Sequence, residues 1–139
     1  RSFKFLGSFF SCNTIPTLPL PDIAFLGRSN VGKSSMLNCL AGGNRPLARE
    51  SKTPGRTRAI NMFNCADSSG DLCIFVDLPG YGFAKMSKAE QESLSEVVHE
   101  YLNTRESLML CVVLIDPRRG PMEADYSLIK VRFVENRLY

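Results

Sequence analysis

The sequence predicts an α/β fold in a single domain that spans residues 1–139. Short apolar runs that suit strands alternate with segments whose apolar residues recur at helical spacing. The longest such run, 108–116, has the composition expected of a central parallel strand that is covered on both faces. This alternation is typical of a mostly parallel sheet joined by right-handed crossovers.

The composition is that of a globular protein, with 44% hydrophobic and 22% charged residues and a net charge of +3. No apolar run reaches the ~18 residues that a membrane helix needs, so we expect no membrane association. The cysteines form no closely spaced pair, which favours reduced thiols in an intracellular, reducing compartment over disulfides or a metal site. They are Cys12, Cys39, Cys65, Cys73 and Cys111.

Strands and helices can be placed along the chain from these patterns. The segments that suit strands are 3–12, 22–27, 59–66, 72–77 and 108–116. Residues 1–21 are read as an N-terminal strand and a proline-rich lead-in. One helix opens near Lys33, a second begins at Ser87, which forms a capping box with Glu90, and a third begins the tail 126–139. The sequence "DSSGD" (67–71) predicts a hairpin turn.

The segment between the strand 22–27 and the first helix matches the pattern G-x-x-x-x-G-K-[ST]. Its glycines let backbone N–H groups turn inward around a phosphate, and the following helix N-terminus adds a favourable dipole. Lys33 can reach the outer phosphates, and the Ser34 hydroxyl can bind Mg²⁺. The pattern predicts a P-loop NTPase whose ligand-binding residues are Gly27, Arg28, Ser29, Asn30, Val31, Gly32, Lys33, Ser34 and Ser35.

A second element of the same chemistry follows the strand 72–77. The strand ends in Asp77, and Leu78, Pro79 and Gly80 come next. A carboxylate here can hold Mg²⁺ through water, and Gly80 can offer its N–H to a γ-phosphate. Its distance from the phosphate loop favours a GTPase switch over a nucleotide kinase or an ATPase.

The polar loop 44–58 lies between these two elements, where a GTPase has its first switch. This loop must supply a hydroxyl to Mg²⁺, and the spacing does not choose between Thr53 and Thr57. Its basic side chains suit the phosphates of RNA as well as they suit a solvated loop.

Several motifs together resemble the EngB/YihA (YsxC) family of small GTPases, over about residues 3–129. The motifs are "GRSNVGKSS", "SKTPGRT", "DLPGYGFAK", "YLNTRESL" and "LIDPRRGP". The resemblance implies a Ras-like G domain that binds GTP and GDP with Mg²⁺ and hydrolyses GTP slowly. It also implies a role in assembly of the large ribosomal subunit, with family links to cell division and septation.

The resemblance also implies roles for particular residues, a binding partner and a cellular compartment. It implies catalytic roles for Lys33, Thr57 and Gly80, and Mg²⁺ binding by Ser34, Thr57 and, through a water, Asp77. It places the first switch on Gly55, Arg56, Thr57, Arg58 and Ala59. It implies a monomer that contacts the large ribosomal subunit or its RNA, in the bacterial cytoplasm or in a mitochondrion or plastid.

Two features depart from common GTPase patterns. Tyr81 stands where many GTPases carry a water-orienting glutamine, which predicts a low intrinsic rate. The guanine-reading motif of the family contains Lys-x-Asp, which this sequence lacks. We therefore expect an incomplete G domain whose C-terminal part is missing. Two alternatives stay open: a non-hydrolysing RNA- or ribosome-binding module, and a P-loop ATPase or kinase.

Overall fold

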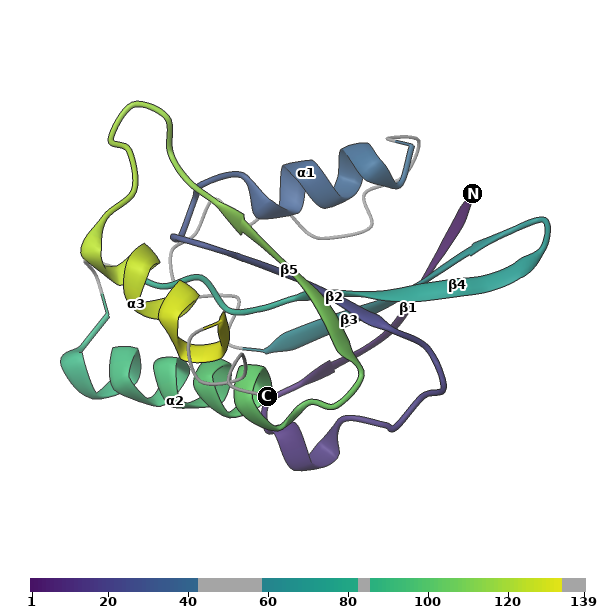
Figure 1. The fold of residues 1–139 in the computed structure, drawn as a ribbon, viewed down its shortest axis with the longest axis horizontal. Coiled ribbons are helices and arrows are strands. Elements are labelled where there is room, and N and C mark those ends of the chain that lie inside the picture. Colours follow the sequence, from purple (N-terminus) through teal and green to yellow (C-terminus); the bar gives the residue numbers. More distant parts are fainter. Residues whose placement is uncertain (43–58, 83–85, 134–139) are drawn as a thin grey trace.

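The computed structural model describes residues 1–42, 59–82 and 86–133. Five strands form one sheet in the order β1-β3-β4-β2-β5, with α1 on one side and α2 and α3 on the other (Figure 1). The strands are β1 (Ser2–Phe9), β2 (Asp22–Gly27), β3 (Ile60–Asp67), β4 (Gly70–Asp77) and β5 (Leu108–Leu114). The helices are α1 (Lys33–Leu40), α2 (Lys88–Thr104), α3 (Glu123–Phe133) and a short 3-10 turn, η1 (Cys12–Thr14). No described helix is both long and apolar enough to cross a membrane.

The sheet is mixed. β2 pairs in parallel with β4 and β5, as the sequence predicts, whereas β3 pairs antiparallel with both β1 and β4. The predicted hairpin turn at 67–71 is confirmed, because Asp67 faces Gly70 across the turn. Gly70 has a φ of 125°, which favours glycine. This turn makes β3 and β4 antiparallel. The expectation of a mostly parallel sheet therefore holds for β4-β2-β5 alone.

The central strand β2 separates two layers of core. Ala24 and Leu26 pack with the cluster that includes Val98 of α2, while Phe25 packs on the opposite face against Leu37 of α1. Successive side chains of a strand point to opposite faces, so a strand covered on both faces is apolar wherever its side chains have no polar partners. This explains the apolar run from Ile23 to Leu26 within β2.

β5 differs from the expectation of a central strand covered on both faces. In the described part of the chain its strand neighbour is β2 alone, and it forms one edge of the sheet. Met109 is 77% exposed and Leu110 is 51% exposed. The prediction was wrong because an apolar run shows that a strand belongs to a sheet, while the number of its neighbours depends on the rest of the fold.

The starts of the two helices on the same side of the sheet, α2 and α3, can be compared with the sequence-based predictions. The Glu90 N–H donates to Ser87 Oγ at 3.3 Å and the Ser87 N–H donates to Glu90 Oε2 at 3.0 Å, which confirms the predicted capping box of α2. α3 begins at Glu123, three residues before the predicted start of the helix in the tail.

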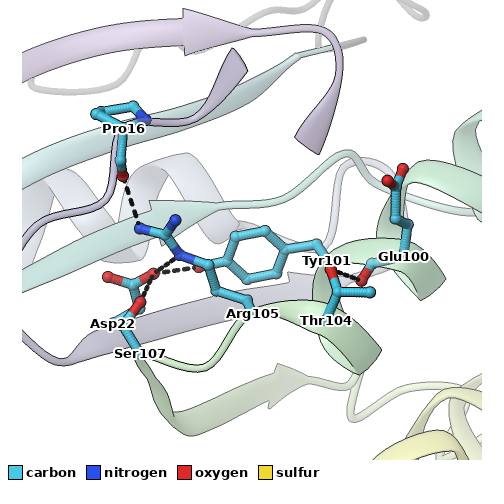
Figure 2. Close-up of polar contacts among 7 residues, drawn as sticks. All are labelled: Pro16, Asp22, Glu100, Tyr101, Thr104, Arg105 and Ser107. Atoms are coloured by element: carbon cyan, nitrogen blue, oxygen red, sulfur yellow. Dashed lines mark hydrogen bonds and ion pairs between the residues drawn. The ribbon is translucent and has the colours of Figure 1, made fainter. Parts of the chain in front are cut away.

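A buried polar cluster anchors the end of α2 to the sheet (Figure 2). Asp22, fully buried at the start of β2, accepts hydrogen bonds at Oδ2 from Tyr101 (2.8 Å), Arg105 (2.7 Å) and Ser107 (3.0 Å). Arg105 also donates to the carbonyl of Pro16 in the lead-in, at 3.1 Å. Asp22 and Gly27 lie at opposite ends of β2. The cluster therefore holds α2 against β2 at the end of the strand that is away from the phosphate loop.

Candidate nucleotide-phosphate site

The parallel strands bring the two predicted phosphate-binding elements together. Phe25 of β2 faces Asp77 of β4, and Gly27 faces Leu114 of β5, so the carboxyl ends of three strands lie at one edge of the sheet. The loop after β2 and the loop after β4 therefore start side by side, and the Leu78 N–H donates to the Phe25 carbonyl at 3.2 Å. Ligands of parallel α/β sheets bind at this kind of edge.

The loop from Gly27 to Ser34 has the backbone shape that its residue types suggest. A Cβ on Gly27 would lie 2.7 Å from Val31 Cγ1 and 2.9 Å from the Leu114 carbonyl oxygen, so only glycine fits at the end of β2. Asn30 (φ 62°) and Gly32 (φ 106°) both adopt positive φ values. Gly32 is the N-cap of α1, so the turn ends at a helix N-terminus, where the backbone dipole favours an anion.

Lys33 and Asp77 form the buried charged centre of the site. Lys33 is 9% exposed, and burial lowers the pKa of its ammonium group while Asp77 opposes that shift. Burial raises the pKa of Asp77 to about 6, opposed by Lys33 and by a hydrogen bond from Asn61. Each charge thus partly offsets the cost of burying the other.

The Asp77 carboxylate has an unused acceptor. Its Oδ1 is buried and has no hydrogen-bond partner, which is costly unless a ligand or cation meets it. Together with the Ser34 hydroxyl in the first turn of α1, it offers the hard oxygen ligands that suit Mg²⁺. The described residues contain no group of three or more His, Cys, Asp or Glu side chains, so a cation here needs further ligands from hydroxyls, phosphates or water.

The second predicted element packs directly on the phosphate loop. A Cβ on Gly80 would lie 3.1 Å from the backbone N of Ser29 and 3.2 Å from Lys33 Nζ. The Ser29 N–H donates to the Tyr81 carbonyl at 2.9 Å. The Tyr81 hydroxyl donates to Asp125 of α3, so its phenol is directed to that helix.

Most of the predicted ligand-binding residues lie in the described structure. The residues from Gly27 to Ser35 and from Asp77 to Gly80 form the two adjoining elements at one edge of the sheet. Ala59 is buried immediately before β3. Thr53 and four of the predicted site residues lie outside the described residues, so the choice between Thr53 and Thr57 stays a prediction. The four are Gly55, Arg56, Thr57 and Arg58.

Two polar residues of this region are absent from the sequence-based prediction. Asn61 faces Asp77 across β3 and β4, but counting from the Asp67–Gly70 pair would set it opposite Val76. A β-bulge between Cys65 and Ala66 shifts the register by one residue and hides the contact. Asp125 had a weak signal, an acidic residue in the first turn of a helix, which does not indicate its contact with Tyr81.

Comparisons with known proteins agree with this geometry. A family model described as "50S ribosome-binding GTPase" matches residues 22–137. The chain is 45% identical over 134 residues to a "Probable GTP-binding protein EngB" of Rickettsia felis. The aligned residues cover 96% of this chain and 61% of that protein. It is 45% identical over 130 residues to the protein of the same name from Desulfosudis oleivorans, with 94% and 64% covered.

A solved structure gives the same result. The crystal structure of a probable GTP-binding protein EngB matches with a TM-score of 0.57 and 28% identity, over 79% of this chain and 62% of that one. The chain spans about three-fifths of the length of these relatives. With the phosphate loop, Asp77 and Gly80 arranged as described, the chain belongs to the 50S ribosome-binding GTPase family and, within it, to the EngB group.

Proposed function

We propose that this chain binds GTP and GDP with Mg²⁺ and hydrolyses GTP to GDP and phosphate. The observation that carries the proposal is the buried Lys33–Asp77 pair beneath the phosphate loop, with Gly80 packed on the same loop. A lysine in an apolar core would be costly without an anionic partner, and its place at the start of α1 suits a polyphosphate. The family description and the names of the relatives support a guanine nucleotide.

In this proposal the chain's residues divide the tasks of phosphoryl transfer. The backbone of 28–34 and the Lys33 ammonium group hold the phosphates, and Gly80 offers its N–H to the γ-phosphate. Ser34 and Thr57 bind Mg²⁺ directly, and Asp77 binds it through water; the ion would neutralise charge on the β- and γ-phosphates. Residues 55–59 form the first switch.

We further propose that the protein acts as a monomeric switch in assembly of the large ribosomal subunit, in contact with that subunit or its RNA. The family description supports this role, as it refers to binding of the 50S ribosome. The proposal includes the links to cell division and septation that the resemblance to the EngB/YihA family implies. The matched relatives are bacterial, which supports the bacterial cytoplasm as the compartment, with a mitochondrion or plastid as the alternative.

Equilibrium binding of fluorescent GTP, GDP and ATP analogues, with and without Mg²⁺, tests the nucleotide proposal. We expect guanine-selective binding that Mg²⁺ enhances, and phosphate release from GTP. Lys33→Ala should lower the affinity for the GTP analogue about tenfold or more, because charged hydrogen bonds to the phosphates are lost. Lys4→Ala is the matched control, since Lys4 is exposed on β1.

The other outcomes favour the alternatives. Selectivity for ATP would support a P-loop ATPase or kinase. Failure of the folded chain to bind any nucleotide, together with ribosome binding that Lys33→Ala leaves unchanged, would support a non-hydrolysing RNA- or ribosome-binding module.

A further inference from the structure

The loop that follows β4 is closed on the phosphate loop by backbone contacts. We call residues 80–82 the second-switch segment. Its Tyr81 carbonyl accepts the Ser29 N–H at 2.9 Å, and Arg28 and Tyr81 form an isolated parallel β-bridge. The Ser29 N–H of the phosphate loop is thus bonded within the protein and is not available to a phosphate.

Side chains reinforce this closed arrangement from α3. The Tyr81 hydroxyl donates to Asp125 Oδ1, and the Met122 N–H donates to Asp125 Oδ2 at 2.7 Å. Asp125 is 1% exposed, so both of its oxygens depend on these protein donors. Arg28 contacts Met122 through Nη1 and Sδ, and lies against Gly82. The phosphate loop, the second-switch segment and the start of α3 meet at this point.

The closed segment occupies space next to Lys33. A Cβ added to Gly80 would lie 3.2 Å from Lys33 Nζ and 3.1 Å from the Ser29 backbone. In the proposed function a γ-phosphate is held by Lys33 and by the Gly80 N–H, so Gly80 would have to withdraw from Ser29 and Lys33 to make room for it. A diphosphate does not extend that far, so it makes no such demand.

The segment also has room to move. A cleft of about 430 Å³ lies between it, α2 and α3, and is lined by Tyr81, Gly82, Val98 and Leu128 among others. Tyr81 is half-buried at its rim, while Asp125 stays fixed in the first turn of α3. Breaking the Tyr81–Asp125 contact would therefore leave the segment held by its backbone contacts with Arg28 and Ser29 alone, without opening the core.

We propose that Asp125 is a positioning residue that holds Tyr81, and with it the second-switch segment, closed on the phosphate loop, so that a γ-phosphate must compete with this contact. The inference rests on the proposed guanine nucleotide function and deepens it. The Tyr81–Asp125 contact makes the chain favour GDP over GTP by stabilising the closed segment. It has no part in holding the α- or β-phosphate.

The test uses Tyr81→Phe, which removes the hydroxyl and leaves the Met122 N–H bonded to Asp125. We expect the affinity for a non-hydrolysable GTP analogue, relative to that for GDP, to rise about tenfold, the effect of losing one hydrogen bond to a charged group. Asp125→Ala should act in the same direction, and combining it with Tyr81→Phe should add little. Asp125→Asn keeps one acceptor for the Met122 N–H, and its NH2 group can donate to the Tyr81 oxygen, so the ratio should stay near the wild-type value.

Tyr126→Phe is the matched control, because Tyr126 is adjacent on α3 and exposed. It should leave the ratio unchanged. A purely structural role of Asp125 predicts that the variants weaken GDP and GTP analogue alike. That result, or a ratio that falls in Tyr81→Phe, would overturn the proposal.

Amide hydrogen exchange at Ser29 gives a readout that needs no nucleotide. Tyr81→Phe and Asp125→Ala should speed exchange of this amide, while Tyr126→Phe should not. If the wild-type chain binds neither nucleotide, the proposed function fails, but exchange at Ser29 still decides the inference. Unchanged exchange in both variants would show that the contact does not hold the segment closed.

Discussion

Gly27 joins the end of β2 to the phosphate loop, and its missing side chain is a steric requirement. The space that a Cβ would take is bounded by Val31 Cγ1 at 2.7 Å and by the Leu114 carbonyl oxygen at 2.9 Å. The Val31 methyl can rotate away, whereas the carbonyl belongs to the backbone of β5. A single added methyl group therefore pushes the phosphate loop away from the sheet.

We predict that Gly27→Ala lowers the free energy of unfolding by about 1–3 kcal/mol more than Gly70→Ala does, as expected for overpacking. Both glycines have a positive φ, 158° and 125°, but nothing lies within 4 Å of a Cβ on Gly70. The difference between the variants therefore reports the contact with Val31 and Leu114. Urea denaturation measures it, and equal losses in the two variants would refute the argument.

At the scale of elements, the position of α2 depends on a buried carboxylate. Asp22 receives three donors at Oδ2, while its Oδ1 is buried without a hydrogen-bond partner. A buried ion pair adds little net stability compared with an apolar pair, but removing one partner is costly because the other stays buried. The cluster thus specifies where the end of α2 meets β2 and β5, as Figure 2 shows.

The cluster also predicts alkaline sensitivity. Burial, and next the Asp22 charge, raise the pKa of Tyr101 well above its ordinary value of 10.0. Above about pH 10 the unfolded chain releases the tyrosine proton that the folded chain keeps, so the unfolding free energy falls as pH rises. Tyr101→Phe removes this effect, which amounts to at most about 1.4 kcal/mol per pH unit.

Urea titrations at several pH values check this prediction. Tyr101→Phe should be less stable than the wild type by a constant amount up to about pH 10, because one buried hydrogen bond is lost. Above that pH the gap between the two proteins should narrow. A gap that stays constant at higher pH would mean that Tyr101 does not keep its proton in the folded chain.

At the scale of the molecule, one edge of the sheet is apolar. β5 is bounded on one side by β2, and Met109, Leu110 and Ile115 are exposed along and just after it. Exposed edge strands with apolar side chains are templates for pairing with another chain. We therefore expect this edge to promote association of single chains.

We predict that Met109→Lys raises the concentration, and the temperature, at which light scattering detects association. The free energy of unfolding should change little, because the Met109 side chain is mostly exposed. Phe10→Lys is the control, since Phe10 is 71% exposed but lies just after β1 at the other side of the sheet. An equal gain from Phe10→Lys would point to general charge effects instead of the β5 edge.

Local patterns explain why much of the site could be predicted. Phosphate binding demands particular residue types at short spacing, so residues 27–34 and 77–80 are recognisable in the chain and lie side by side in the structure. The capping box of α2 and the turn at 67–71 depend on contacts within a few residues and are likewise confirmed. The role of Thr57 stays a prediction, as this residue lies outside the described part.

The sequence by itself thus determined the α/β class and indicated the candidate phosphate loop with its neighbour Asp77, because each rests on short-range patterns. Only the tertiary structure decided that β5 lies at an edge, that a bulge sets Asn61 opposite Asp77, and that Asp125 meets Tyr81. These features join segments that are far apart in the chain. Their pairing depends on how the whole sheet and its helices pack, a free energy that no short stretch of sequence contains.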